Sequence, residues 1–136
     1  MKIIYWSGTG NTEKMAELIR DGIVQAGKDV NLMNVSDVNV NEVLEDEILV
    51  LGCPAMGDEI LEESEFEPFI EEISSKISGK KVALFGSYGW GDGQWMRDFE
   101  ERMMSYGCSI IDSPLITQYE PDENECIDFG KRIASL

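Results

Sequence analysis

MKIIYWSGTGNT, residues 1–12, joins an apolar run to a short loop of hydroxyl residues and glycines. The apolar run, Ile3 to Trp6, is typical of a strand that is buried on both faces, as in a parallel sheet. Residues 15–26 then place apolar side chains at helical spacing. A strand, a small-residue loop and a helix start direct several backbone N–H groups at one point, which predicts a site for a small anion.

The loop after the first strand supplies neutral donors only. It lacks the lysine of the GxxxxGK[ST] loop and the third glycine of GxGxxG, which excludes both nucleotide motifs. A strand-to-helix turn capped by Ser and Thr, without any ligand, remains the alternative. The candidate phosphate-binding residues are Ser7, Gly8, Thr9, Gly10, Asn11 and Thr12.

The chain is strongly acidic. Its 136 residues include 27 Asp and Glu against 11 Lys and Arg, a formal net charge of −16. This charge argues against nucleic acid and anionic membranes as partners and favours a protein with a basic face. The alternative is that the charge only keeps the protein soluble. The length predicts one domain over residues 1–136.

Cysteine and histidine content argue against metal and disulfide chemistry. The three cysteines, Cys53, Cys108 and Cys126, form no CxxC pair, and the chain contains no His. We therefore predict no metal site and no disulfide framework, with Cys53 and Cys108 as small core residues. The first apolar stretch is too short for a signal peptide and no segment is long enough to span a membrane, so we expect a cytoplasmic protein.

Strand and helix patterns alternate five times along the chain. Buried strands are expected near residues 3–6, 48–53 and 82–87, and a less apolar strand over 30–35 is expected toward a sheet edge. A last strand over 108–117 is interrupted at Pro114. Ser64 with Glu67 resembles a capping box before a helix. The alternation predicts an α/β fold: a five-stranded parallel sheet, order 2-1-3-4-5, with helices on both faces.

Three loops leave the carboxyl edge of this sheet, where α/β proteins bind ligands. The second, residues 54–59, carries Met56 outside any helical stripe, where a thioether packs well on a flat ring. Gly57 permits an unusual φ or a peptide that changes orientation. Glu59 can accept a hydrogen bond from a ring N–H, although a solvated acid is the alternative for that residue.

The third loop, residues 88–93, places Trp90 between Gly89 and Gly91. A large flat side chain there suits stacking on a flat ligand, and the glycines let backbone amides reach its edge. The three loops together predict a site for a flat heterocycle with one phosphate. FMN fits this description, and the residues alone leave other mononucleotides open.

The first loop, GCPAMGDE (52–59) and GSYGWGDG (86–93) together resemble short-chain, clostridial-type flavodoxins, over essentially the whole chain. The strand order above is the one for which flavodoxin is itself a standard example. The resemblance implies non-covalent FMN, with residues 7–12 at the phosphate, Met56 and Trp90 on the two ring faces and Glu59 at the pyrimidine N–H. It implies a Gly57–Asp58 peptide that flips on reduction.

The resemblance also completes the predicted binding set. By the resemblance, residues 118–120 are expected to border the ring. Trp6 is expected to flank the phosphate loop because it ends the first strand. Pro54, which offers no donor, stands where some relatives have a hydroxyl residue. The remaining predicted cofactor-binding residues are Pro54, Ala55, Asp58, Ser87, Tyr88, Gly89 and Gly91.

The function implied is that of an electron carrier, with no catalytic residues of its own. It would work at low potential, mainly between semiquinone and hydroquinone, because the net charge disfavours an anionic flavin. Its expected partners are ferredoxin-type reductases and oxidoreductases with basic surfaces, and we expect a monomer. The alternative is a small FMN-dependent reductase of quinones or NAD(P)H. A receiver domain is excluded because residues 5–7 lack carboxylates.

Overall fold

The computed structural model describes residues 1–136 and contains one parallel sheet. Its strands follow the order β2-β1-β3-β4-β5, which confirms the predicted order, and β6 also pairs with β4. Parallel strands that follow one another in the chain must be joined by long crossover connections, and the helices supply them. The strands are β1 (Lys2–Tyr5), β2 (Asn31–Asn34), β3 (Ile48–Gly52), β4 (Lys81–Tyr88), β5 (Ser109–Ile110) and β6 (Leu115–Gln118).

The predicted last strand consists of two short strands along β4. β5 pairs with the start of β4, where Lys81 lies opposite Ser109. β6 pairs with its end, where Tyr88 lies opposite Gln118. Pro114, which has no N–H to donate, separates them as predicted. The residues after β6 therefore reach the same edge of the sheet as those after β4.

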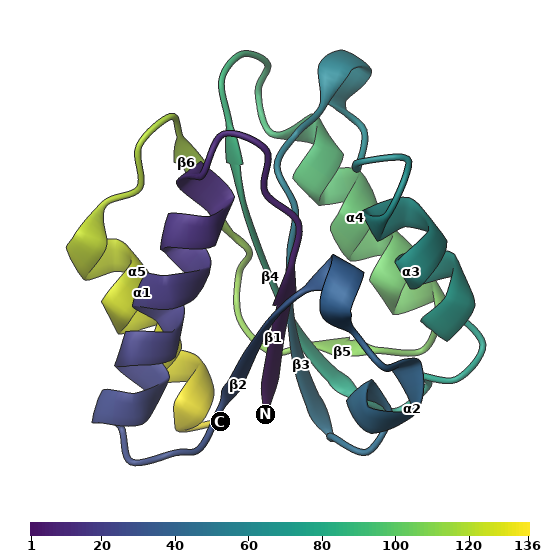
Figure 1. Ribbon diagram of the computed structural model, residues 1–136, viewed down its shortest axis with the longest axis vertical. Helices are drawn as coiled ribbons and strands as arrows, with labels where there is room; N and C mark the ends of the chain where they lie inside the picture. The colour runs from purple at the N-terminus through teal and green to yellow at the C-terminus, as the bar shows by residue number, and fades with distance from the viewer.

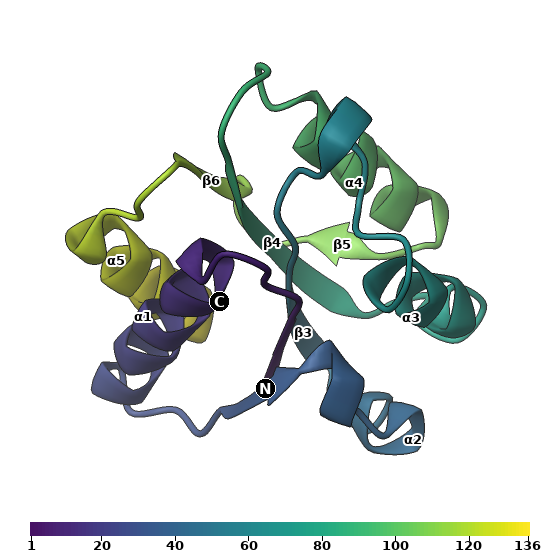
Figure 2. The same cartoon turned by 45° about the horizontal axis from the view of Figure 1, so that its top comes forward.

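Helices cover both faces of the sheet. Figures 1 and 2 show α1 and α5 side by side on one face, and α3 and α4 on the other. The longer helices are α1 (Asn11–Gln25), α3 (Phe66–Ile73), α4 (Gln94–Ser105) and α5 (Glu123–Ala134). The short helical turns are η1 (Val35–Asp37), α2 (Val40–Val43) and η2 (Gly57–Glu59).

Two hydrophobic cores lie on opposite faces of the sheet, because successive side chains of a strand alternate. Ile3 and Tyr5 of β1 pack in the core beneath α1 and α5. Ile4 packs in the core beneath α3 and α4, together with Cys53 and Cys108. All three cysteines are buried and free, which confirms that Cys53 and Cys108 are core residues.

The N-terminus of α3 differs from the predicted capping box. Glu62, and not Ser64, caps it: Glu62 Oε1 accepts from the N–H groups of Glu65 at 2.7 Å and Phe66 at 3.0 Å, and Oε2 accepts from Ser64 N at 2.8 Å. Glu67 instead binds Arg102 of α4. The Glu62 carboxylate caps the helix in place of Ser64 because it is buried beside several otherwise unpaired amides at once.

None of the helices combines the length and the apolar character needed to cross a bilayer. In Figure 1 the segments that follow β1, β3, β4 and β6 all emerge at the upper end of the sheet. The candidate site lies at this edge.

Candidate cofactor site

A cavity of about 350 Å³ opens where the three predicted loops meet. Each loop contributes to its wall, and so does the segment that follows β6. The lining residues are Trp6, Gly8, Thr9, Asn11, Pro54, Ala55, Met56, Ser87, Tyr88, Gly89 and Tyr119. The wall mixes apolar surface with hydroxyl and amide groups and contains no charged side chain, as suits a flat ring with a polar tail.

The first loop is held by Ser7. Its Oγ accepts from the N–H groups of Gly10 and Glu13, both at 3.2 Å, so its hydroxyl proton is left to donate elsewhere. Gly10 takes the N-cap position of α1 with φ of 103°, and no side chain caps that position. The first-turn amides of Asn11 and Thr12 therefore have no side-chain acceptor, which is the arrangement that binds anions.

A buried hydrogen bond joins the first loop to the third. Thr12 Oγ1 and Ser87 Oγ lie 2.8 Å apart, and both side chains are almost fully buried. Thr12 thus sets the spacing between the two loops and stands behind the cavity wall. Sequence reasoning placed both residues at the site and missed the bond, because 75 positions separate them.

The second loop forms a closed turn with unusual backbone conformations. Met56 N donates to Ile60 O at 2.9 Å, and Glu59 N donates to Met56 O at 2.9 Å. Positive φ falls at Asp58 (65°) and Glu59 (52°), and not at Gly57, where the sequence suggested it. Non-glycine residues in this region are strained, and such strain gathers at ligand-binding and switching segments.

Glu59 carries an unsatisfied buried oxygen. Its Oε1 is shielded from solvent and has no hydrogen-bond partner. The same oxygen lies in the space that a side chain at Gly91 would occupy, so Glu59 contacts the third loop there. A buried carboxylate oxygen without a donor is costly, and an N–H group of a bound ring would pair it.

The third loop is held by the segment after β6. Tyr119 N donates to Tyr88 O at 2.8 Å, and Gln118 Nε2 donates to Gly89 O at 3.1 Å. Tyr119, with φ of 60°, is 63% exposed, and its ring lies over Gly89. Trp90 is 66% exposed and does not line the cavity.

About half of the predicted cofactor-binding residues, nine of seventeen, line the cavity. Trp6 and Tyr119, to which the sequence gave only a flanking place, both line it, whereas Trp90 does not. Ser7, Gly10 and Thr12 shape the first loop behind the wall. The other predicted residues outside the cavity lining are Gly57, Asp58, Glu59 and Gly91.

Trp95, whose helix-face spacing predicts a core residue or a pocket wall, is a core residue that also supports two of the loops. It is buried at the start of α4, and its indole Nε1 donates to Cys53 O at 3.1 Å. Its ring also packs on Tyr88, with 5.4 Å between ring centroids. One side chain thus supports the starts of the second and third loops. Helix-face spacing predicted the burial of Trp95, but no local pattern indicated its hydrogen bond to Cys53, which is 42 positions away.

The pKa shifts near the site indicate structural roles. Burial raises the pKa of the Cys53 thiol to about 12, so it stays protonated and unreactive. Burial, helped by the hydrogen bond to Glu13, raises the pKa of Tyr5 to about 12. Burial opposes ionisation of Glu62, but hydrogen bonds from Ser64, Phe66 and Glu65 outweigh it and lower the pKa of that carboxyl.

The chain is similar along its whole length to proteins of one family. The family profile described as Flavodoxin matches residues 3–130. The chain belongs to the flavodoxin family. It is 75% identical over 138 residues to the flavodoxin of Clostridium beijerinckii, covering 100% of both chains. It is 43% identical over 134 residues to that of Megasphaera elsdenii, covering 98% of both.

Solved structures of flavodoxins have the same fold. The solution structure of two-electron reduced Megasphaera elsdenii flavodoxin matches with a TM-score of 0.93 at 45% identity, covering 99% of this chain and 98% of that one. A flavodoxin from the domain Archaea matches with a TM-score of 0.83 at 29% identity, covering 99% of this chain and 97% of that one.

Membership of the flavodoxin family confirms three predictions: the resemblance, the fold class and FMN as cofactor. The protein is an electron carrier that serves redox partner proteins, and not an enzyme. The alternative of an FMN-dependent reductase is not supported by these relatives.

Proposed function

We propose that the three loops hold FMN and that the protein carries single electrons at low potential, working mainly between the one-electron-reduced and the fully reduced states. The observation that carries this proposal is the unpaired, buried Oε1 of Glu59, which meets Gly91 beside a cavity lined by neutral groups. When bound, FMN supplies a ring that accepts electrons one at a time. The residues around the ring determine how strongly each negative charge added to it is disfavoured.

The phosphate end would be held by residues 7–12. Amides of the first turn of α1 and the hydroxyls of Ser7 and Thr9 supply donors, and the loop brings no cation to the phosphate. Because the protein repels anions at long range, affinity must come from these short-range donors. Pro54 lines the cavity without contributing a donor.

The ring end would be held by the second and third loops. Met56 lines the cavity and would cover one face of the ring, and Trp90, exposed on its loop, would turn to cover the other. Glu59 would accept from the ring N–H. The backbone of Gly89 and Gly91 would meet the ring edge, with Ala55, Ser87 and Tyr88 lining the passage towards the phosphate. The Gly57–Asp58 peptide, beside the strained Asp58, is the one we propose to reorient on reduction.

The acidic surface accounts for the low potential. Adding an electron to a site in a protein of charge −16 is opposed by every nearby carboxylate, and apolar walls weaken solvent screening. The same charge favours partners with basic surfaces, such as ferredoxin-type reductases, and disfavours self-association. We therefore propose a monomeric, single-domain protein over residues 1–136 that works in the cytoplasm.

Stepwise anaerobic reduction of the FMN-loaded protein tests the proposal. We expect two separate one-electron steps in the visible spectrum, with the second at much lower potential than the first. A single two-electron step would overturn the proposed cycle. Failure of the apoprotein to quench the fluorescence of added FMN would overturn the proposed site.

A further inference from the structure

The middle of the third loop is held by one side chain from the end of β6. Gln118 Nε2 donates to Gly89 O at 3.1 Å, just after Tyr119 N donates to Tyr88 O at 2.8 Å. Among residues 89–91, the carbonyl of Gly89 is the only one that accepts a hydrogen bond. A carbonyl oxygen only accepts, so the residue at position 118 must supply a donor, and the amide of glutamine does so.

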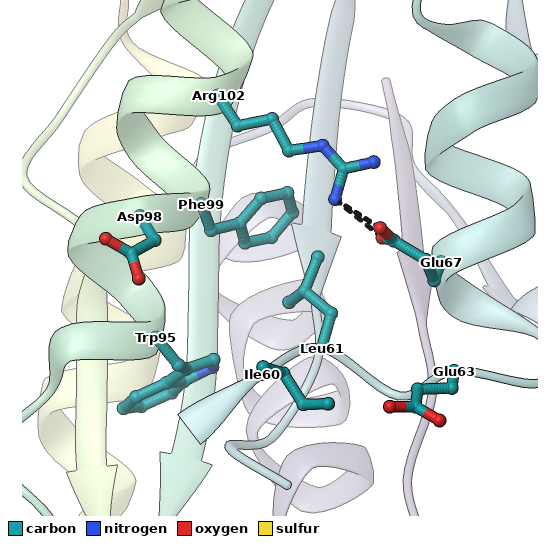
Figure 3. Close-up of a pocket in the computed structure, with 8 residues that line it drawn as sticks. All are labelled: Ile60, Leu61, Glu63, Glu67, Trp95, Asp98, Phe99 and Arg102. Carbon is teal, nitrogen blue, oxygen red and sulfur yellow. Dashed lines mark hydrogen bonds and ion pairs between the residues drawn. The ribbon is translucent and has the colours of Figure 1, made fainter. Parts of the chain in front are cut away.

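The two ends of the third loop are anchored by other groups. The Tyr88 ring packs on Trp95, with 5.4 Å between ring centroids. Trp95 lies in turn in the wall of a second cavity, of about 320 Å³, between α4 and the segment after η2 (Figure 3). At the far end, Arg97 Nη1 donates to Asp92 O at 3.1 Å. Between these anchors, Gln118 provides the only hydrogen bond to a loop carbonyl.

The two bonds from the end of β6 also determine where the loop's N–H groups point. A trans peptide is planar, and its C=O and N–H groups point in opposite directions. The carbonyls of Tyr88 and Gly89 point towards residues 118–119, so the N–H groups of Gly89 and Trp90 point away from them. In the sheet, β3 lies on the other side of β4 from β6. These N–H groups are therefore directed towards the second loop and the cavity.

The N–H groups of the third loop are available to a ligand. Those of Gly89, Trp90 and Gly91 donate to no protein group. The unpaired Oε1 of Glu59 lies beside them, at Gly91. Donors beside an acceptor match a ring edge that carries acceptor oxygens next to an N–H group. A reversed Gly89–Trp90 peptide would instead turn its carbonyl towards those oxygens and repel them.

We infer that Gln118 is a positioning residue for the cofactor: by holding the Gly89 carbonyl, it keeps the Trp90 N–H directed at the acceptor edge of the ring. The inference rests on the proposed function and adds to it a residue outside the cavity lining. A donor at this edge is worth most when the ring carries negative charge, because charge-assisted hydrogen bonds are the stronger ones. Gln118 therefore favours the fully reduced state, and it does so without a charge of its own.

Gln118→Leu tests the inference, because leucine is similar in size and cannot donate. Gln94→Leu is the matched control. Gln94 is also exposed, at the start of α4, but its amide binds only the side chains of Asp98 and Arg97. Each variant is compared with the wild type as apoprotein and as FMN-loaded protein. The readouts are the NMR signals of the third loop, the FMN affinity and the two potentials.

Two neighbouring peptides of the loop provide an internal comparison. In the Gln118→Leu apoprotein, the carbonyl carbon signal of Gly89 should move, whereas that of Tyr88, which the backbone of Tyr119 holds, should not. In the FMN-loaded variant, the Trp90 amide should exchange with solvent about three- to tenfold faster, and the Gly89 amide less than about twofold faster. Equal acceleration of both amides would mean a general loosening of the loop and would overturn the inference.

The bound cofactor gives a second result. Gln118→Leu should weaken FMN binding about threefold. It should also make the second potential about 30 mV more negative, a threefold change in the equilibrium constant at about 59 mV per tenfold for one electron. Removal of a carboxylate acts in the opposite direction, so this shift has a different cause from the overall field. Gln94→Leu should change neither quantity. An unchanged second potential in Gln118→Leu would overturn the inference.

Failure of the proposed function is recognised separately. If the wild-type apoprotein bound no FMN, or if the loaded protein were reduced in one two-electron step, the proposed function would fail and the positioning role with it. The carbonyl signal of Gly89 in the apoprotein would still show whether Gln118 holds the loop. Normal FMN binding and two separate steps in the wild type, with no difference in Gln118→Leu, would overturn the positioning role alone.

Discussion

The Oε1 of Glu59 lies where a side chain at Gly91 would stand, so the second and third loops meet through a carboxylate that has no hydrogen-bond partner. This contact brings together residues that are 32 positions apart in the sequence. It leaves the carboxylate beside the cavity and requires Gly91 to have no side chain.

Gly91→Ala should weaken FMN binding by more than about tenfold, because the new methyl group meets Glu59 and φ is 93° there. Fluorescence titration of the apoprotein with FMN measures the effect. Gly79→Ala is the matched control, with φ of 88° and open space around the added carbon. It should cost about 1–2 kcal/mol of unfolding free energy and leave FMN affinity unchanged. Equal loss of affinity in both variants would refute the steric explanation.

Glu59→Gln should weaken FMN binding about tenfold, because a hydrogen bond to a charged acceptor is worth about 1.5–3 kcal/mol. It should also raise the potential of the second reduction step, since one negative charge beside the cavity is removed. Spectroelectrochemistry measures both potentials. Glu63→Gln, at an exposed position that makes no contact with Gly91, should raise the lower potential by less. An unchanged lower potential in Glu59→Gln would contradict the electrostatic account.

Glu62→Gln should lower the unfolding free energy by about 1–2 kcal/mol at neutral pH, because charge-assisted bonds to the start of α3 are lost. The folded pKa of Glu62 lies below its unfolded value of about 4.3, so its contribution is present above that pH and is lost as pH falls through the folded pKa.

Urea unfolding at several pH values checks this prediction. The difference between the wild type and Glu62→Gln should shrink as the pH is lowered from about 5, the side on which the carboxyl becomes protonated. Glu65→Gln, whose side chain is exposed, should show no such dependence. A constant difference across the acidic range would mean that the charge of Glu62 does not hold α3.

Trp95→Phe should weaken FMN binding several-fold in the folded protein, because Cys53 O loses its donor where the second loop begins. Loss of one buried hydrogen bond should also cost about 1–3 kcal/mol of stability. Phe99→Leu is the control, since Phe99 is buried on the same helix and makes no hydrogen bond to the loop. Thermal unfolding and FMN titration separate the effects. If Trp95→Phe binds FMN as tightly as Phe99→Leu does, then Trp95 acts by packing alone and its hydrogen bond does not support the site.

Local sequence pattern was enough to predict the strands and helices and their order along the chain. β1 (Lys2–Tyr5) is a buried strand because the apolar run that begins at Ile3 has no polar face to turn outward. Pro114 interrupts the last predicted strand because it lacks an N–H. Local pattern alone does not predict which residue caps the N-terminus of α3. Ser64 and Glu67 have capping-box spacing, yet Glu62 is buried against more amides and Glu67 is drawn to Arg102, a residue 35 positions away.

The sequence by itself determined the α/β alternation, the phosphate loop and the three loops that gather at one edge, because these depend on period, glycine placement and parallel strand direction. Only the tertiary structure decided which atoms meet there. The Thr12–Ser87 bond, the support of Cys53 by Trp95 and the unpaired oxygen of Glu59 against Gly91 all join segments distant in the chain. Such contacts arise when the sheet aligns the ends of β1, β3 and β4, which no local pattern records.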